Sequence, residues 1–274
     1  MAKFDLNEVL ANKMPRGSRY IPRFVVRALE RLIHADEMNT VLDLYDTLPP
    51  QQFIRALFSR WEITYTAHGL EHTDPSERYL FASNHPFGGM DGMMLADLLT
   101  DRFGDVRVLV NDLLMHVYPL KELWMPVNKH GRQSAEYARK IRESMEGPLP
   151  VLTFPAGLCS RRRHGRVDDT EWKPTFVKQA LASGRKIVPV YVDGRLSDRF
   201  YRTARLRECL GIRFNAEMVL LPDEMIRQSG HRFDIYFGEP VDPRELEAAG
   251  SLRDKTLCIR ARVDELRRMY GNEK

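Results

Sequence analysis

FASNHPFGGMDG, residues 81–92, is the stretch that decides the fold class of this 274-residue chain. The apolar residues from Tyr79 onward predict a strand that ends near His85. A turn with one proline and two glycines follows, and Asp91 comes where a helix should begin. In open α/β sheets, ligand sites lie where strands end and helices begin, so this corner is the first candidate for a functional site.

The same alternation of strand and helix continues on the carboxyl side of this stretch. Apolar β-prone runs predict strands, and apolar residues three and four apart predict helices. The predicted strands are residues 63–66, 79–82, 106–110, 151–154, 187–192 and 233–237, and the predicted helices include 90–99, 134–145 and 252–269. This alternation favours an α/β fold with a mostly parallel central sheet flanked by helices.

Residues 1–61 are predicted to form an N-terminal helical extension, and residues 62–274 a single α/β domain. Residues 21–33 place apolar side chains on one helical face and arginines off it, and a second apolar stripe covers residues 53–61. Two helices packed on a core explain both stripes. A helix with an apolar face and arginines also suits a membrane surface.

The composition is that of an ordinary folded protein, with 43% hydrophobic and 29% charged residues. No apolar run reaches the roughly 18–20 residues that span a bilayer, and residues 1–12 do not resemble a signal peptide. The three cysteines are scattered without a CxxC pair, which favours free thiols in a reducing cytosol and disfavours a zinc site. The net charge of +4 suits an anionic membrane or an acidic carrier without requiring either.

His85 and Asp91 carry the chemistry that the corner predicts. A histidine works better as a general base beside a carboxylate, which fixes its tautomer and stabilises the imidazolium that forms. Asp91 is favourably placed as an anion near a helix N-terminus, and the Gly88-Gly89 pair permits close approach of a substrate. Taken singly, the His and the Asp are better explained by capping, but Asn84 and the glycines beside them favour catalysis.

An Asn-His pair followed shortly by Asp after an apolar strand resembles the signature of the glycerolipid (lysophosphatidic acid) acyltransferase superfamily. The resemblance implies that His85 deprotonates the acceptor hydroxyl, which attacks an acyl thioester, and that Asp91 orients His85. The superfamily leaves four residues between His and Asp, whereas five intervene here; one extra residue turns a helix by about 100° unless a loop absorbs it. The variant HPFGGMDG is similar to the hemolysin-like branch, which includes amino-acid-lipid O-acyltransferases.

Residues 124–129 and 187–190 resemble the second and fourth blocks of the superfamily. The second block ends at a basic residue, here Lys129, which keeps the charge of the usual arginine without its two-pronged geometry. On this block alone, a strand end with a surface lysine would be the simpler interpretation. The fourth block is an apolar strand with a proline and is expected to line the acyl pocket.

FPAGLCS, residues 154–160, resembles the third block, with matches at Phe154, Pro155, Gly157 and Ser160. Ala156 and Cys159 stand where the superfamily has the Glu and Arg that help to bind a glycerol-phosphate acceptor. Arg161 either supplies an anion-binding group from a shifted position or belongs with the next two arginines to a solvated basic loop. Cys159 is interpreted as a small apolar filler and not as a nucleophile.

The resemblance implies an acyltransferase that moves a fatty-acyl group from acyl-CoA or acyl-carrier protein to a lysolipid-type acceptor, without a metal or redox cofactor. The third block favours a lyso amino-acid lipid over lysophosphatidic acid. We expect a cytoplasmic protein in peripheral contact with the inner face of the membrane and without a nucleic-acid partner. Besides the catalytic His85 and Asp91, the residues expected to bind substrate are Asn84, Gly88, Gly89, Lys129, Phe154, Pro155, Gly157, Ser160 and Arg161.

Two other classes of function stay open. The HPFGG turn faintly resembles the oxyanion loop of esterases, but the sequence has no G-x-S-x-G elbow, which disfavours a thioesterase or lipid hydrolase. The basic run at 161–166 suits a non-catalytic protein that binds an anionic surface, although no nucleic-acid-binding motif accompanies it. The sequence also lacks a P-loop and a G-x-G-x-x-G segment, which disfavours nucleotide-dependent chemistry.

Overall fold

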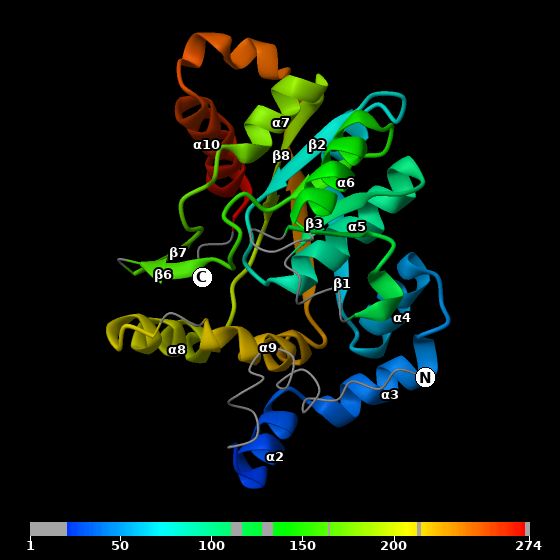
Figure 1. Ribbon diagram of the computed structural model, residues 1–274, viewed down its shortest axis with the longest axis vertical. Helices are drawn as coiled ribbons and strands as arrows, with labels where there is room; N and C mark the ends of the chain where they lie inside the picture. Colours follow the sequence, from blue (N-terminus) through cyan, green and yellow to red (C-terminus); the bar gives the residue numbers. More distant parts are fainter. Residues whose placement is uncertain (1–20, 111–116, 128–133, 164, 213–214, 272–274) are drawn as a thin grey trace.

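In the residues that the computed structural model describes (21–110, 117–127, 134–163, 165–212 and 215–271), a seven-stranded sheet forms the centre of the protein (Figure 1). Its strand order is β1-β9-β8-β2-β5-β3-β4. The strands from β8 to β4 are parallel, whereas β9 pairs antiparallel with β8, and β1 pairs parallel with β9. The strands are β1 Thr64–His68, β2 Tyr79–Ser83, β3 Arg107–Val110, β4 Trp124–Pro126, β5 Val151–Thr153, β8 Lys186–Val192 and β9 Arg232–Phe237.

Helices cover both faces of this sheet, and a small antiparallel pair of strands lies beside it (Figure 1). The small pair consists of β6 Arg161–Arg163 and β7 Arg166–Asp168. The α-helices are α2 Arg23–Leu32, α3 Ala35–Tyr45, α4 Pro50–Arg60, α5 Gly89–Phe103, α6 Ser134–Glu146, α7 Thr175–Ser183, α8 Asp198–Cys209, α9 Leu221–Arg227 and α10 Leu252–Tyr270. The 3-10 turns are η2 Leu70–His72, η4 Tyr118–Leu120, η5 Ala216–Leu220 and η6 Pro243–Ala249.

Two hydrophobic cores form because alternate residues of the central strands point to opposite faces of the sheet. Phe81 of β2 and Val188 of β8 belong to the first core, together with α4 and α5. Leu80 and Ile187 belong to the second, together with α7 and α10. Every residue of β2 is buried, as expected for a parallel strand covered on both faces. The end of β2 is therefore a rigid platform for the residues that follow it.

The α/β class and the mostly parallel sheet predicted from the sequence are confirmed. Each of the six predicted strands begins and ends within two residues of its expected bounds. The sequence did not predict the β6–β7 pair, because three consecutive arginines carry no apolar alternation and pair only through their antiparallel neighbour. Helix α3 was also missed, since its only buried residue is Val41 and it shows little apolar periodicity.

The predicted N-terminal extension contains α2, α3 and α4, while residues 1–20 lie outside the described residues. Helix α4 shares the first core with the sheet, through Phe53, Ile54, Leu57 and Phe58. Helix α2 has no buried residue. Helix α4 packs against α5 as part of one core. The division into 1–61 and 62–274 stays a prediction.

Arg185 joins α6 to the sheet from inside the protein. Its side chain is fully buried, and its guanidinium donates to the carbonyl oxygens of Tyr79, Ser144, Met145 and Gly147. Burial lowers its pKa to about 10. The last carbonyls of a helix have no partner within the helix, so this cation satisfies the end of α6 and fixes where β5 begins beside β2.

Candidate active site

His85 lies just beyond the carboxyl end of β2, and Phe154 follows the carboxyl end of β5, the parallel neighbour of β2. Between them and β8, Asn84 fixes the end of the strand. Its side-chain amide donates to the carbonyl of Val192 at 2.9 Å and accepts from the N–H of Val192 at 2.7 Å. The sequence predicted that Asn84 binds substrate. In the structure, its side chain instead holds β8 beside the turn that carries His85.

The ring of His85 approaches the carboxylate of Asp91, with 3.0 Å between Nδ1 and Oδ2. Asp91 is fully buried, and its Oδ2 also accepts from the N–H groups of Phe87 (2.9 Å) and Gly88 (3.0 Å). The Nδ1–Oδ2 distance is that of a hydrogen bond, but the two groups are not aligned for one, and Asp91 Oδ1 has no hydrogen-bond partner among the described residues. Catalytic hydrogen bonds commonly align only when substrate binds.

Gly88 absorbs the extra residue between His85 and Asp91. Its φ of +75° lies in the region that favours glycine, and it directly precedes α5, in which Asp91 is the third residue. A Cβ at this position would lie 3.0 Å from Cys159 Sγ and 3.0 Å from a methyl of Leu221. The glycine turn therefore brings His85 and Asp91 together despite the longer spacing.

Burial raises the pKa of Asp91 above its ordinary value, and the close approach and charge of the His85 ring oppose that shift. Phe154 stacks on the His85 ring, with centroids 4.1 Å apart and planes inclined by 29°. Nδ1 is inaccessible, whereas the His85 side chain as a whole is 16% exposed. Nε2 is therefore the ring nitrogen that is left for a substrate.

A second carboxylate holds the main chain of His85. Asp169, the residue after β7, accepts at Oδ1 from the N–H of His85 (3.2 Å) and the hydroxyl of Ser160 (2.6 Å), and at Oδ2 from the indole N–H of Trp172 (2.9 Å). The N–H of Ser160 donates to the carbonyl of His85 at 2.8 Å. The sequence identified Ser160 but gave no signal for Asp169 or Trp172, since Asp169 lies 84 residues from His85 along the chain.

Arg161 is buried, and its guanidinium donates to Glu217 Oε1 at 2.6 Å and to the carbonyl of Cys159 at 2.7 Å. It also lies over the ring of Phe200 of α8, 5.2 Å from the centroid. The structure therefore uses this charge to join β6 to η5 and α8, and does not present it at the surface.

The remaining predicted residues lie around the same corner. Gly89 begins α5, and Pro155, the residue after Phe154, is buried. Gly157 is exposed, and its N–H donates to the carbonyl of Phe154 at 2.9 Å. Lys129 lies outside the described residues.

Cys159 packs inside the protein beside Gly88. Burial raises the pKa of its thiol to about 12. The thiolate is the nucleophilic form of cysteine, so this residue is poorly suited to covalent catalysis and fits the role of an apolar filler.

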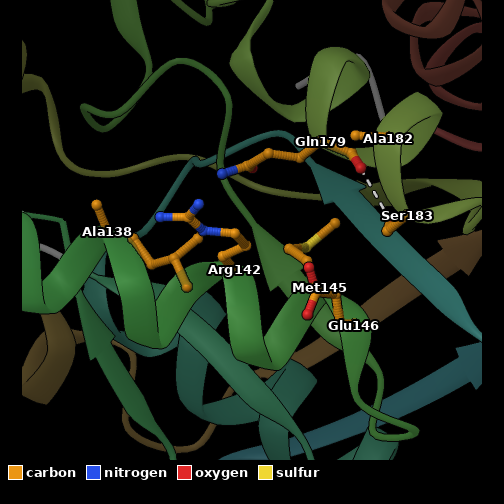
Figure 2. Close-up of a pocket in the computed structure, with 8 residues that line it drawn as sticks. Ala138, Arg142, Met145, Glu146, Gln179, Ala182 and Ser183 are labelled. Atoms are coloured by element: carbon orange, nitrogen blue, oxygen red, sulfur yellow. Dashed lines mark hydrogen bonds between the residues drawn. The ribbon is translucent and has the colours of Figure 1, made fainter.

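A shallow groove between α6 and α7 lies apart from this chemistry (Figure 2). Side chains of α6, among them Arg142 and Met145, line one side, and Gln179 and Ser183 of α7 line the other. None of the predicted site residues lines this groove. The candidate site is therefore defined by the contacts of His85.

Beside the site, α8 exposes one face that mixes leucines with arginines. We call this the α8 face: Arg202, Arg205, Leu206, Cys209 and Leu210 are all exposed and are spaced three and four residues apart. Leu206 and Leu210 are 61% and 64% exposed. The β6–β7 pair lies against α8 through the 2.6 Å contact of Arg162 with Asp198. None of the described helices is both long and apolar enough to cross a bilayer.

Comparison with known proteins finds a family that matches most of this chain. Residues 8–270 match the family described as acyltransferase. A lyso-glycine lipid O-acyltransferase from Bacteroides thetaiotaomicron is 37% identical over 238 residues, which cover 86% of this chain and 88% of that protein. One from Phocaeicola vulgatus is 38% identical, with 86% and 85% covered. The crystal structure of the 1-acyl-sn-glycerophosphate acyltransferase PlsC from Thermotoga maritima shares the fold, with a TM-score of 0.50, 14% identity, and 97% and 98% of the two chains covered.

Proposed function

We propose, from the premise that this chain belongs to the acyltransferase family, that it transfers a fatty-acyl group from a thioester to a lysolipid hydroxyl with His85 as general base. Nε2 of His85 takes the hydroxyl proton as the oxygen attacks the thioester carbonyl. The tetrahedral intermediate then collapses to the ester as its C–S bond breaks, and the leaving thiolate takes the proton from the imidazolium. Asp91 stabilises the imidazolium between the two steps.

The observation that carries this proposal is the 3.0 Å approach of His85 Nδ1 to the buried Asp91 Oδ2. A carboxylate at Nδ1 favours the tautomer that leaves Nε2 unprotonated and able to accept a proton. The ring is further oriented by its stacking on Phe154. The proposed step uses no metal or redox cofactor.

We place the oxyanion of the tetrahedral intermediate at the first turn of α5. The N–H of Gly157 already donates to a carbonyl, and the N–H of Gly88 donates to Asp91. The next N–H groups, those of Gly89 and Met90, have no acceptor within their own helix. They also lie at the positive end of the helix dipole, which favours a developing negative charge.

The acceptor that we propose is a lyso amino-acid lipid, with a lyso-glycine lipid as the first candidate. Two relatives with more than a third of their aligned residues identical are named for O-acylation of that lipid. Ala156 and Cys159, both buried, offer no charged group at the positions where the resemblance expects binding of a glycerol phosphate. Arg161 is paired with Glu217 instead. The donor is proposed to be acyl-CoA or acyl-carrier protein.

The first test offers the purified protein a labelled long-chain acyl-CoA with either lyso-glycine lipid or lysophosphatidic acid. We expect the glycine lipid to be acylated at least tenfold faster, because each missing contact to a charged phosphate is worth about 1.5–3 kcal/mol. Faster acylation of lysophosphatidic acid would contradict the acceptor. Free fatty acid as the sole product would indicate a hydrolase. The same assay with acyl-carrier protein as donor decides between the two thioesters.

We further propose that the α8 face rests on an anionic membrane, so that the protein works in peripheral contact with the inner leaflet. Arginines attract anionic headgroups, and leucines enter the interface. Helix α8 also adjoins the site, because Phe200 lies under Arg161 of β6. At α2, Phe24 is 74% exposed and directly follows Arg23, and we propose that it extends the same contact.

The α8 face predicts a specific loss of vesicle binding. Leu206→Glu combined with Leu210→Glu should lower binding to phosphatidylglycerol vesicles at least tenfold, since burial of each leucine contributes up to about 1.5–3 kcal/mol. Leu257→Glu is the control, because Leu257 is 53% exposed and belongs to α10, a helix that lies away from α8 in Figure 1. Cosedimentation with phosphatidylglycerol and phosphatidylcholine vesicles gives the comparison. Equal binding by both variants would assign the contact to another surface.

A further inference from the structure

The main chain of His85 is held on both of its polar groups by two residues, the buried Ser160 and the partly buried Asp169. Its N–H donates to Asp169 Oδ1, and its carbonyl accepts from the N–H of Ser160 at 2.8 Å. Ser160 is itself bound to the same Asp169 oxygen through its hydroxyl, at 2.6 Å. A shift of Asp169 would therefore move the residue that carries the general base.

Asp169 is also anchored by two further side chains. Trp172 donates its indole N–H to Oδ2 at 2.9 Å and packs edge-on against Phe176 of α7. Arg260 of α10 donates to the carbonyl of Asp169 at 3.3 Å and to the carboxylate of Asp168 at 3.0 Å. These contacts make the carboxylate a fixed part of the scaffold, 84 residues from His85 along the chain.

Asp169 also acts on the charges of the site. Burial raises its pKa, and hydrogen bonds from Ser160 and Trp172 and the charge of His85 oppose that shift. Its negative charge in turn helps to raise the pKa of Asp91. The ionisable groups that face Asp169 are His85, Asp91 of α5, Arg260 and Asp264 of α10, and the Cys159 thiol.

The geometry points to Asp169 as a positioning residue for acyl transfer: it holds the main chain of His85 while Asp91 holds the ring, and its charge supports the imidazolium. This inference rests on the proposed function of His85 as general base. During proton transfer the ring becomes a cation that interacts with the charges of both Asp91 and Asp169. Residues that orient a functional group through its neighbours commonly affect activity by about 10–100-fold.

The test removes the charge of Asp169 without breaking its bonds to His85. In Asp169→Asn the amide oxygen can keep the bonds from His85 and Ser160, but its NH2 then faces the indole N–H of Trp172. The double variant Asp169→Asn/Trp172→Phe removes that conflict. Trp172→Phe alone is the matched control, because it lacks the same indole but keeps the carboxylate.

We expect kcat of the double variant to fall about 10–100-fold relative to the control, because the imidazolium that forms during proton transfer loses an attracting charge, with KM for donor and acceptor changed less than about threefold. The acidic limb of its pH profile of kcat should move to lower pH, because the imidazolium loses an attracting charge. A kcat within about twofold of the control and an unmoved acidic limb would overturn the proposal.

A second readout does not depend on turnover. Ring ¹⁵N resonances of the histidines are titrated in the control and in the double variant, and His85 is assigned by its absence in His85→Ala. Protonation of the His85 ring should occur at lower pH in the double variant. Identical titrations would overturn the role of Asp169. Absence of acyl transfer by the wild type would instead overturn the proposed function, and the titration would still decide on Asp169.

Thermal unfolding shows whether the double variant is folded. If it does not unfold cooperatively, Ser160→Ala takes its place. This variant removes the 2.6 Å hydroxyl bond to Asp169 and keeps the N–H bond to the His85 carbonyl. A loss in kcat of about fivefold is then expected for one buried hydrogen bond, and an unchanged kcat would overturn the proposal.

Discussion

Replacement of His85 by alanine should lower kcat for acyl transfer about 10²–10⁴-fold, the usual contribution of a positioned general base. The acceptor hydroxyl would lose the only ring nitrogen that Asp91 leaves available. KM should change little, because the proposed interaction strengthens as the proton moves and not when the lipid binds. Initial rates with the labelled thioester and the preferred acceptor, on protein checked by thermal unfolding, measure the effect.

Two further variants sharpen this result. His72→Ala removes a half-exposed histidine of η2 whose partner is Glu239, and it should leave kcat unchanged. His85→Gln keeps a polar side chain that cannot accept and return a proton at neutral pH, so it should be as inactive as His85→Ala. Transfer by His85→Ala within tenfold of the wild type would exclude His85 as the general base.

The sequence predicted the part of the fold that is written in local patterns. Strands β2, β5 and β8 are buried on both faces, so each appears as a continuous apolar run. The His85–Asp91 pair could also be predicted from the sequence, because both residues lie within one turn and the start of one helix. A short-range spacing, combined with the resemblance to a known family, was enough to bring these two residues into one hypothesis.

The rest of the site depends on contacts between distant segments, which no local pattern records. Asp169, which Trp172 holds, meets His85 only because the segment before α7 folds back to the end of β2. Gly194 is required for a similar reason: a Cβ there would lie 2.2 Å from the ring of Phe87. Asn84 was expected to bind substrate, but its register beside β8 gives both its polar groups to Val192. Such roles follow from strand order, which the sequence alone did not determine.

Asp91→Asn should separate activity from stability at the same position. The amide oxygen can take the place of Oδ2, which accepts from Phe87 and Gly88, and the NH2 then occupies the place of Oδ1, which has no hydrogen-bond partner among the described residues. The shape of the site is kept, but the imidazolium of His85 loses its counter-charge. We expect kcat to fall about 10²-fold or more. Asp101→Asn, an exposed carboxylate on the same helix, is the matched control and should keep its activity.

The stability of Asp91→Asn should improve relative to the wild type as the pH rises. Burial raises the pKa of Asp91 above its ordinary 3.8, so the folded state holds this proton more tightly than the unfolded state. As the pH rises from 3.8 through the folded pKa, the free energy of unfolding of the wild type falls, and asparagine, which has no proton to lose, removes that fall. Urea unfolding of both proteins between pH 4 and 8 measures the difference. A difference that instead moves in favour of the wild type with rising pH would mean that attraction to His85 outweighs burial, and that the carboxylate stabilises the fold as well as the imidazolium.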